Sequence, residues 1–419
     1  MPTAVDCFCG AGGSACGLTA ASFDVRMGLD HDAAALRVYR ANHSHEARQM
    51  DLGDVGTVVE TLRAVGPIDV LSASPPCTDF SSAGNREERG HVAGLTVACA
   101  QVAVTLGVRC VLIENVPELL RSQAWAEARD LLVGAGYSMV VLRVNSAACG
   151  VAQVRRRVFV VATLGCDELA LHRVEHEAAG FNRTPADAPT VRCCLSDPAA
   201  ATYWNNARSR HSPCVRSVDL PSPTLRCNCL ASPPPQYEPR LDDAGPLSEA
   251  RVLTADEMGR VASFPPGYFD SVQHRTVAGK FIGNCVPPLM AEQVARWVLD
   301  LLCAPVNTVE RPVCLQRMRR IANRVSRRDR LMDLGLVDRG ATLADDGSLH
   351  YVGGSSARGD RVVERVLGWL PFEGWRVQVK PRRAVVEATQ GPLDDLYVHE
   401  PGRQQPYRSI RQLLRAHPL

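Results

Sequence analysis

The first 160 or so residues alternate between two hydrophobic periods. Short apolar runs typical of buried strands fall at residues 3–8, 25–29, 68–71, 109–113, 137–144 and 157–163. Segments with helical spacing lie between them, at residues 14–21, 32–41, 54–65, 94–106 and 124–134. Strands that alternate with helices in this way predict an α/β fold with a doubly wound parallel sheet.

The pattern changes after residue 164. Residues 165–250 are rich in Pro, Cys, Asn, Arg and Asp and show little periodicity, which predicts a separate irregular insert. Helical spacing returns at residues 251–264 and 289–302. We therefore expect one domain built from residues 1–164 and 251–304, interrupted by an insert at 165–250.

Residues 305–419 form a C-terminal extension with its own pattern. An apolar stripe at helical spacing is surrounded by arginines, and residues 369–386 resemble a pair of strands, which together predict a small α+β module. The stripe consists of Leu315, Met318, Ile321 and Val325. This extension carries 20 Lys and Arg against 13 Asp and Glu, a charge of +7, whereas the rest of the chain carries −5. A basic extension suits a polyanion or an acidic partner, and the alternative is a solvated helix face.

Composition narrows the class of protein. The chain has 419 residues, of which 46% are hydrophobic and 22% charged, as in an ordinary globular protein. No apolar run reaches membrane-spanning length, and the N-terminus lacks a signal-peptide pattern, so we expect a cytoplasmic protein without membrane contact. The 16 cysteines are then expected to be reduced thiols.

Reactive side chains gather where the predicted strands end. Cys77 follows Pro75 and Pro76, which stop the strand at residues 68–71 and stiffen the turn. Glu114 ends the strand at 109–113, and three arginines at 155–157 precede the strand at 157–163. Ligands of open α/β sheets bind at such strand ends, which makes Cys77 a candidate nucleophile. The alternatives are an inert buried thiol and a solvated arginine turn.

A glycine turn at residues 9–13 follows the first strand. It lacks the G-x-G-x-x-G spacing and the Gly-Lys-Ser/Thr of a P-loop, which disfavours phosphate binding. Asp30 follows about 20 residues later, where an acidic residue grips a ribose in such folds. The alternative is that the acidic position only caps the helix that follows, a role that Asp32 could serve equally well.

Six motifs then occur in one consistent order from residue 3 to about 303. They are Asp6-Cys-Phe-Cys-Gly-Ala-Gly-Gly13, Pro76-Cys-Thr-Asp-Phe-Ser-Ser-Ala-Gly84, Glu114-Asn-Val116, Gln153 with Arg155 and Arg157, the segment from Arg251 to Phe264-Pro265, and Gly283-Asn-Cys-Val286. In this order they resemble the motifs of the cytosine carbon-5 DNA methyltransferases. The resemblance implies a Rossmann-like methyltransferase sheet that uses S-adenosyl-L-methionine (AdoMet) and acts on duplex DNA.

The resemblance also implies catalytic roles. Carbon 5 of cytosine is a poor nucleophile, and a Cys77 thiolate that adds to carbon 6 activates it. Glu114, if held in an apolar pocket, would protonate N3, and Arg155 and Arg157 would favour the thiolate and hold the base. The target base must leave the duplex to be reached.

The remaining implied residues bind the cofactor or read the DNA. The expected cofactor-binding residues are Phe8, Gly10, Ala11, Gly12, Asp30, Asp51, Leu52, Pro76, Leu95, Asn284 and Val286. Residues 165–250 would form the target-recognition domain, in which Thr224, Arg226 and Asn228 are candidate base readers. Zinc binding by Cys193, Cys194, His211, Cys214, Cys227 and Cys229 is an alternative, but no Cys-x-x-Cys knuckle is present and we expect no metal.

The resulting hypothesis is a monomeric DNA cytosine-5 methyltransferase, with a cognate restriction endonuclease as a possible partner. Two rivals stay open. An RNA cytosine-5 methyltransferase would share the fold, and a sequence-specific DNA-binding protein without catalysis would share the recognition segment.

Overall fold

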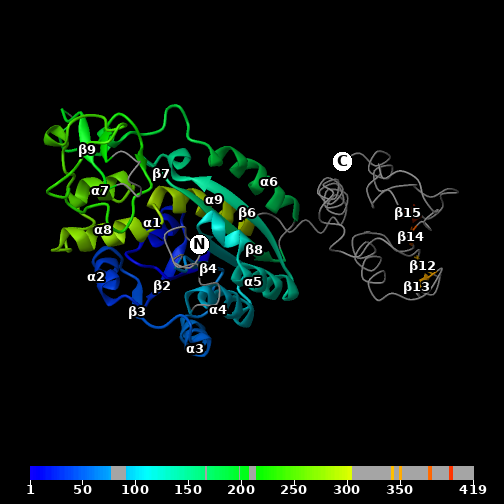
Figure 1. Ribbon diagram of the computed structural model, residues 1–419. Coiled ribbons are helices and arrows are strands. Elements are labelled where there is room, and N and C mark those ends of the chain that lie inside the picture. The colour runs from blue at the N-terminus through cyan, green and yellow to red at the C-terminus, as the bar shows by residue number, and fades with distance from the viewer. Residues whose placement is uncertain are drawn as a thin grey trace, which may run out of the picture. The chain divides into compact units, whose positions relative to one another are not determined.

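In the computed structural model, a seven-stranded sheet forms the centre of the unit made of residues 1–306 (Figure 1). The structure describes residues 1–76, 91–165, 168–197, 199–206 and 214–303, and the backbone of four strands beyond residue 340. The strand order is β3-β2-β1-β4-β5-β8-β6. The strands are β1 (Thr3–Cys7), β2 (Asp24–Asp30), β3 (Glu46–Gln49), β4 (Val70–Ala73), β5 (Cys110–Asn115), β6 (Tyr137–Asn145) and β8 (Arg156–Leu164).

The predicted doubly wound sheet is confirmed, except that β8 runs antiparallel to both of its neighbours. The five strands β1 to β5, which lie in the order β3-β2-β1-β4-β5, all pair in parallel, and helices connect them. Only residues 146–155 join β6 to β8, and they contain the short 3₁₀ helix η2 (Ser146–Cys149) and the two-residue strand β7 (Gln153–Val154). A parallel connection needs a crossover of about a dozen residues or more, so this shorter link returns the chain antiparallel.

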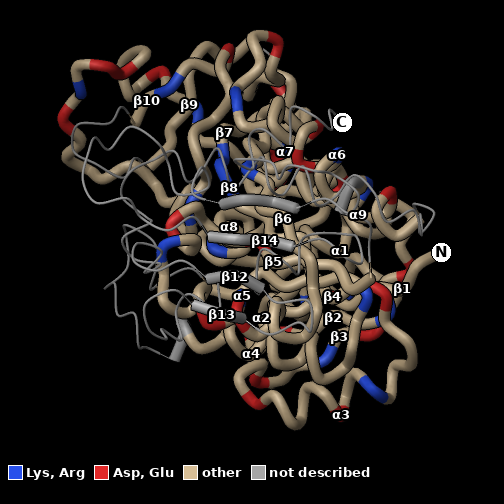
Figure 2. The backbone as a smooth tube through the Cα atoms, turned by 90° about the vertical axis from the view of Figure 1, so that its right-hand side faces the viewer, with Lys and Arg blue, Asp and Glu red and all other residues tan. Residues whose placement is uncertain are grey.

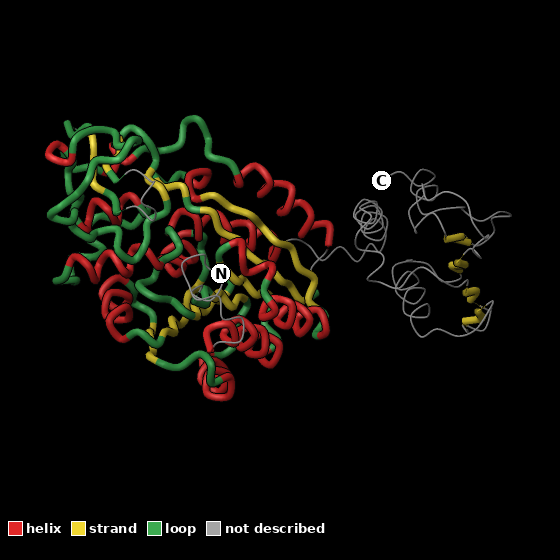
Figure 3. Tube along the Cα trace, in the orientation of Figure 1, coloured by secondary structure: helices red, strands yellow, loops and turns green. Residues whose placement is uncertain are grey.

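Helices cover both faces of the sheet (Figures 1 and 3). Alternate residues of each strand point to opposite faces, so that Val70 packs in one core and Leu71 in the other. The first core includes residues of α1, α2, α6 and α9, and the second includes residues of α3, α4 and α5. These helices are α1 (Gly13–Ala20), α2 (Ala33–Asn42), α3 (Val55–Val65), α4 (His91–Leu106), α5 (Gln123–Gly134), α6 (Glu168–Ala178) and α9 (Pro288–Cys303).

The segment predicted as an irregular insert begins with a regular element. Helix α6 packs against β6 and α9, so its apolar residues Leu171 and Val174 belong to the core of the sheet domain. The rest of the segment is mostly loop, as Figure 3 shows. Its short elements are η3 (Ala179–Asn182), η4 (Val191–Cys194), β9 (Thr202–Trp204), β10 (Val215–Ser217), β11 (Ser222–Pro223) and η5 (Leu247–Glu249).

A third core joins this segment to two helices that follow it. Val191, Tyr203 and Leu225 pack with residues of α7 (Ala255–Val261) and α8 (Arg275–Asn284). Helix α7 begins with a capping box, in which Thr254 and Glu257 satisfy each other's backbone N–H groups. Strands β9 and β10 lie at one end of the domain in the side view of Figure 2.

The C-terminal residues, from Asn307 to Leu419, form a separate unit. Its described backbone is an antiparallel sheet of order β13-β12-β14-β15, made of β12 (Ala341–Leu343), β13 (Leu349–Tyr351), β14 (Arg376–Val379) and β15 (Leu396–His399). The sequence predicted a pair of strands at residues 369–386. In that range the structure describes strand β14, whose partners β12 and β15 both lie outside it. The predicted basic helix around Leu315 to Val325 lies outside the described residues.

Within the described part of the chain, no helix has the length and apolar character needed to cross a membrane.

Candidate active site

A cavity of about 280 Å³ lies at the carboxyl ends of β1, β2, β4 and β5. That size falls near the lower end of ordinary ligand pockets, ~300–1,000 Å³. The cavity brings together most of the residues predicted for cofactor binding and catalysis. Those that line it are Phe8, Gly10, Ala11, Asp30, Pro76, Glu114, Arg155, Arg157, Asn284 and Val286.

The glycine turn after β1 forms one wall of the cavity. Gly10 and Gly12 have φ values of 51° and 102°, in the left-handed region that glycine adopts easily. Phe8 also has a positive φ, 58°, which costs a side-chain-bearing residue about 1–2 kcal/mol. Local strain of this kind is commonly kept at functional sites, because the surrounding contacts hold it in place. A Cβ placed on Gly10 meets no atom within 4 Å, so the backbone there borders open space.

Asp30 ties the glycine turn to the end of β2. Its Oδ2 accepts a hydrogen bond from the Gly10 N–H at 2.8 Å, and its Oδ1 accepts one from the Asp32 N–H at 2.8 Å. Asp32 is the N-cap of α2, since its carboxylate accepts from the N–H groups of Ala34 and Ala35. The two roles considered for an acidic residue here therefore fall to different residues. Asp30 is buried and borders the cavity, whereas Asp32 caps the helix and also lines the cavity rim.

Glu114 and Arg157 form an ion pair inside the cavity. Arg157 Nε lies 3.0 Å from Glu114 Oε1, and both side chains are largely buried, with 12% and 11% exposed. Glu114 is the fifth residue of β5 and pairs with Phe159 on the neighbouring β8. Arg157, two residues before Phe159, is therefore its diagonal neighbour on that strand. The sequence allowed for an apolar pocket around Glu114, and the structure places the Arg157 guanidinium beside its carboxyl group.

Asn115 positions the proline pair that precedes Cys77. Its Nδ2 donates to the Pro75 carbonyl at 3.0 Å, and its Oδ1 accepts from the Val116 N–H at 2.8 Å. The side chain is buried, with 2% exposed. Sequence reasoning placed Asn115 in a motif but gave it no role, since a contact across 40 residues leaves no local signal. Cys77 itself lies outside the described residues.

Two other cysteines line the cavity, and neither is suited to be a thiolate nucleophile. Burial raises the pKa of Cys9 well above its usual value, and the acidic side chains of Asp6 and Asp30 act in the same direction. Burial also raises the pKa of Cys285 to about 12, although Arg155 opposes this shift. Both thiols therefore stay protonated at neutral pH, and reactivity of a cysteine follows its thiolate form.

Arg155 holds three chain segments together at the cavity wall. Its Nη1 donates to the carbonyls of Leu225 and Gly283 at 3.2 and 3.0 Å, and its side chain is buried. Gln153 reinforces the same contact, because its Oε1 accepts from the Leu225 N–H at 3.0 Å. These bonds attach the recognition segment, at Leu225, and helix α8, at Gly283, to the β7–β8 region of the sheet domain. The arginine-turn pattern did not indicate this role.

The candidate base readers lie beside this attachment. The Thr224 hydroxyl donates to the Val154 carbonyl at 2.8 Å, and the half-buried Arg226 donates to the Asn206 carbonyl at 3.0 Å. Asn228 is exposed. The neighbouring Cys227 thiol lies 2.8 Å from Asn284 Oδ1, so this loop borders the cavity.

Four predicted cofactor residues are not part of the cavity lining. Leu52 is buried in the core with Val58 and Leu62, and Leu95 is buried on α4. Asp51 is exposed and its Oδ1 accepts from the Gly53 N–H. Gly12 is the N-cap of α1, next to the lining residues of the turn.

Lys280 is a lining residue that the motif order did not single out. It is one of two lysines in the chain, and its Nζ lies 2.8 Å from Asp32 Oδ2 across the rim of the cavity. The scarcity of lysine beside 45 arginines is the signal that could have drawn attention to it.

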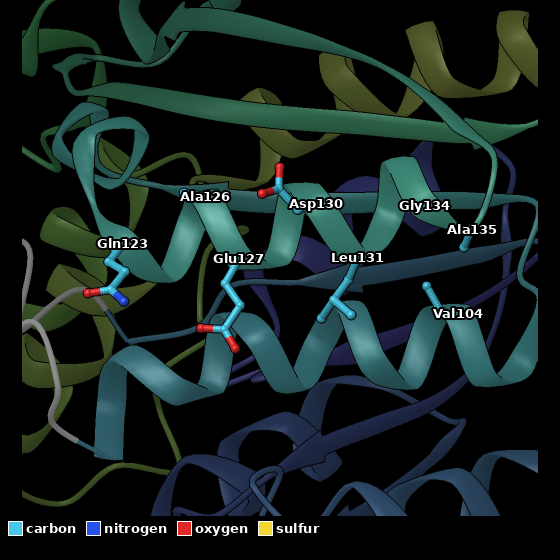
Figure 4. A pocket seen from close by; sticks show the side chains of 8 residues that line it. All are labelled: Val104, Gln123, Ala126, Glu127, Asp130, Leu131, Gly134 and Ala135. Carbon is cyan, nitrogen blue, oxygen red and sulfur yellow. The ribbon is translucent and has the colours of Figure 1, made fainter. Parts of the chain in front are cut away.

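A larger hollow of about 940 Å³ lies elsewhere, between α4 and α5 (Figure 4). Its lining includes Val104 and Leu131, which face each other from the two helices, together with Glu127 and Asp130. It is open to solvent and contains none of the predicted site residues, so we place the chemistry in the smaller cavity. Among the residues described here, no group of three His, Cys, Asp or Glu side chains is arranged to hold a metal ion; His211 lies outside them.

Comparison with known proteins shows the family of the chain. Residues 3–212 match the family model for C-5 cytosine-specific DNA methylase. The chain is 30% identical over 288 residues to the Type II methyltransferase M.HgiDI of Herpetosiphon aurantiacus, covering 68% of this chain and 91% of that protein. It is 28% identical over 308 residues to the Type II methyltransferase M.HindV of Haemophilus influenzae, covering 73% and 99%.

Solved structures share the fold. The crystal structure of the S. pombe Dnmt2 methyltransferase aligns with a TM-score of 0.56 at 18% identity, over 73% of this chain and all of that one. The family match over half of the sequence, and the relative that covers two thirds of it, show that the chain belongs to the C-5 cytosine-specific DNA methylase family and is a DNA cytosine-5 methyltransferase.

Proposed function

We propose that the enzyme methylates carbon 5 of a flipped-out cytosine in a specific duplex DNA site, with AdoMet as the methyl donor. The observation that carries the proposal is the buried Glu114–Arg157 pair in the same cavity as the glycine turn and the anchored Pro75–Pro76. One cavity thus offers groups for a cytosine ring beside groups for a nucleoside cofactor.

The cavity residues fit AdoMet. Gly10 borders open space, so a ligand can approach the backbone closely. The Asp30 carboxylate is suited to accept hydrogen bonds from ribose hydroxyls, and Phe8, Asn284 and Val286 would complete the binding surface. AdoMet, when bound there, supplies an electrophilic methyl group on a sulfonium. It carries no phosphate, which agrees with a glycine turn that lacks a P-loop lysine.

The protein's own groups activate the base. The Cys77 thiolate adds to carbon 6, forming a carbon–sulfur bond and making carbon 5 nucleophilic. Glu114 holds N3 and delivers a proton there, which neutralises the charge that addition creates, while Arg157 fixes the orientation of Glu114. After carbon 5 is methylated, its proton leaves to a base and the bond to Cys77 breaks, which restores the thiolate. The proton on N3 returns to Glu114. Because these atoms are inaccessible in a duplex, the cytosine must be flipped out.

Replacement of the nucleophile tests this function. We expect Cys77→Ser to abolish transfer of label from tritiated AdoMet to duplex DNA while AdoMet binding survives, because a hydroxyl is far less ionised than a thiol. Cys303→Ser, an exposed cysteine on α9, is the matched control and should keep full activity. Substantial turnover by Cys77→Ser would contradict the mechanism, and label in RNA but not DNA would contradict the substrate.

A trapped adduct tests the covalent step directly. Duplex DNA with 5-fluorocytosine at the target has no carbon-5 proton to lose, so the bond between carbon 6 and Cys77 should persist after methylation. We expect a complex stable to denaturing electrophoresis with the wild-type enzyme and none with Cys77→Ser.

We further propose that the enzyme acts as a monomer and protects its sites from a cognate restriction endonuclease, as the Type II names of its relatives suggest. Light scattering should give a mass near the 45.4 kDa of one chain. A plasmid methylated in cells should resist an endonuclease that cuts at the methylated sequence.

A further inference from the structure

The glycine turn is supported by three polar residues, one buried and two half-buried, that the proposed mechanism does not use. Cys16 on α1, His43 after α2 and Tyr268 after α7 meet beside the turn, and none of the three lines the cavity; we call them the turn-support cluster. Tyr268 is 5% exposed. These residues lie far apart in the sequence, and Tyr268 follows the whole recognition segment.

The Tyr268 hydroxyl is the centre of the cluster. It donates to the Ala11 carbonyl of the turn at 2.7 Å. A phenol has one proton, so the His43 ring nitrogen 2.9 Å away must donate to the hydroxyl oxygen, as the Cys16 thiol does at 3.6 Å. The Tyr268 hydroxyl thus accepts hydrogen bonds from two donors and donates one to the backbone of the turn.

Every group in the cluster is neutral at physiological pH. Burial lowers the pKa of His43 to about 4, with the neighbouring His45 acting in the same direction and the Gly12 backbone opposing it. Burial raises the pKa of Cys16 to about 11 and the pKa of Tyr268 far above its usual value. The direction of the hydrogen bonds is therefore fixed over the range in which the enzyme works.

Gly12 shows how closely the cluster fits the turn. A Cβ at this position would lie 2.4 Å from His43 Nε2 and 2.7 Å from the Tyr268 hydroxyl. Its φ of 102° would also strain a larger residue. The turn can approach the two rings only with glycine there. Asn42 locks Tyr268 in place from α2, because its Nδ2 donates to the Tyr268 carbonyl at 3.0 Å.

We propose that Tyr268, held by His43, is a positioning residue that fixes the Ala11–Gly12 peptide in the conformation that binds AdoMet. The inference rests on the proposed function, because it takes the cavity to be the AdoMet site. It adds that a residue beyond the recognition segment sets the cofactor affinity without lining the cavity.

Removal of one hydroxyl tests the proposal. We expect Tyr268→Phe to weaken AdoMet binding roughly three- to tenfold, about what one net hydrogen bond is worth, and to raise KM for AdoMet while kcat and KM for DNA change little. Isothermal titration with AdoMet and with the non-reactive S-adenosylhomocysteine measures the affinity.

Tyr137→Phe is the matched control. Tyr137 is also 5% exposed, and its hydroxyl donates to the Val108 carbonyl at 2.7 Å in the core on the other side of the sheet. Both variants lose a buried hydrogen bond to a backbone carbonyl, so both should lower the thermal unfolding midpoint. Only Tyr268→Phe should lose AdoMet affinity, and an equal loss in both variants would overturn the proposal.

Substitutions of His43 give a second test that does not depend on the folding of Tyr268→Phe. His43→Gln keeps an N–H donor and should retain most of the affinity, whereas His43→Leu should lose as much as Tyr268→Phe. Equal AdoMet affinity in wild type, His43→Leu and Tyr268→Phe would refute the positioning role. A wild-type enzyme that binds neither AdoMet nor S-adenosylhomocysteine would refute the proposed function instead.

Discussion

At the scale of single residues, Asp6 is a carboxyl group placed wholly inside the core, on β1 beneath the glycine turn. Burial, and then the nearby Asp30 carboxylate, raise its pKa to about 8. The folded protein therefore keeps the Asp6 proton between about pH 4 and pH 8, whereas the unfolded chain has lost it. The unfolded state binds fewer protons in this window, so stability should fall as pH rises, by up to ~1.4 kcal/mol per unit.

We expect Asp6→Asn, which keeps the shape but cannot ionise, to remove this dependence. Its free energy of unfolding, measured with urea from about pH 5 to about pH 8, should decline less steeply than that of the wild type. Parallel curves for the two proteins would show that Asp6 does not titrate in this window.

Glu114, whose carboxyl group is in contact with Arg157, is the proposed proton donor to the base. We expect Glu114→Gln to slow single-turnover methyl transfer by ~10²–10⁴, because the amide cannot deliver a proton to the base. AdoMet affinity should change little. Glu127→Gln, an exposed carboxyl group on α5, is the control and should leave the rate unchanged. If Glu114→Gln lost only AdoMet affinity, Glu114 would belong to the cofactor site.

At the scale of elements, the pairing of β11 with β7 joins the recognition segment to the catalytic sheet domain. Ser222 and Pro223 pair in parallel with Gln153 and Val154. A Cβ on Gly283 of α8 would lie 2.1 Å from the Arg226 backbone, so this helix also lies directly against the loop. The loop is therefore held on a fixed support beside the cavity, and its residue Asn228 is exposed.

This support narrows the prediction for specificity. We expect Asn228→Ala to change which DNA sites are methylated without changing AdoMet affinity, because an amide is a good reader of base edges. Thr224→Val removes a hydroxyl already used on the Val154 carbonyl, and should reduce stability while leaving the sites unchanged. Bisulfite sequencing of a modified plasmid reads both outcomes, and an unchanged pattern for Asn228→Ala would exclude it as a reader.

At the scale of the whole molecule, the division near residue 306 separates the methyltransferase from a basic C-terminal unit. We propose that the arginines between 317 and 330 add phosphate contacts to the bound duplex. Each such contact steepens the dependence of log affinity on log salt by roughly 0.9. Truncation after Ala304 should therefore weaken DNA binding mainly at low salt, flatten that slope and leave the methylated sequence unchanged. Fluorescence anisotropy over a salt series measures the slope, and equal slopes would assign the extension another role.

The sequence by itself determined most of the order of strands and helices along the chain, because most elements carry their own hydrophobic period; β3 and α6 are exceptions. It also indicated Asp30 and Glu114 at strand ends, since a turn signal follows a strand locally. Gln153 and Asn115 were found as members of motifs, but the sequence did not indicate what either side chain contacts. The net charge of the extension, by contrast, follows from counting its charged residues.

Only the tertiary structure decided which residues meet. The antiparallel β8 puts Arg157 beside Glu114, and that direction follows from the short link at 146–155 rather than from the composition of the strand. Leu52 and Leu95 lie in the core and outside the cavity lining, because burial depends on neighbours that a single sequence does not reveal. Tyr268 reaches the Ala11 carbonyl across 257 positions. Local sequence encodes local conformation, whereas a contact between distant segments exists only once the folded core has brought them together.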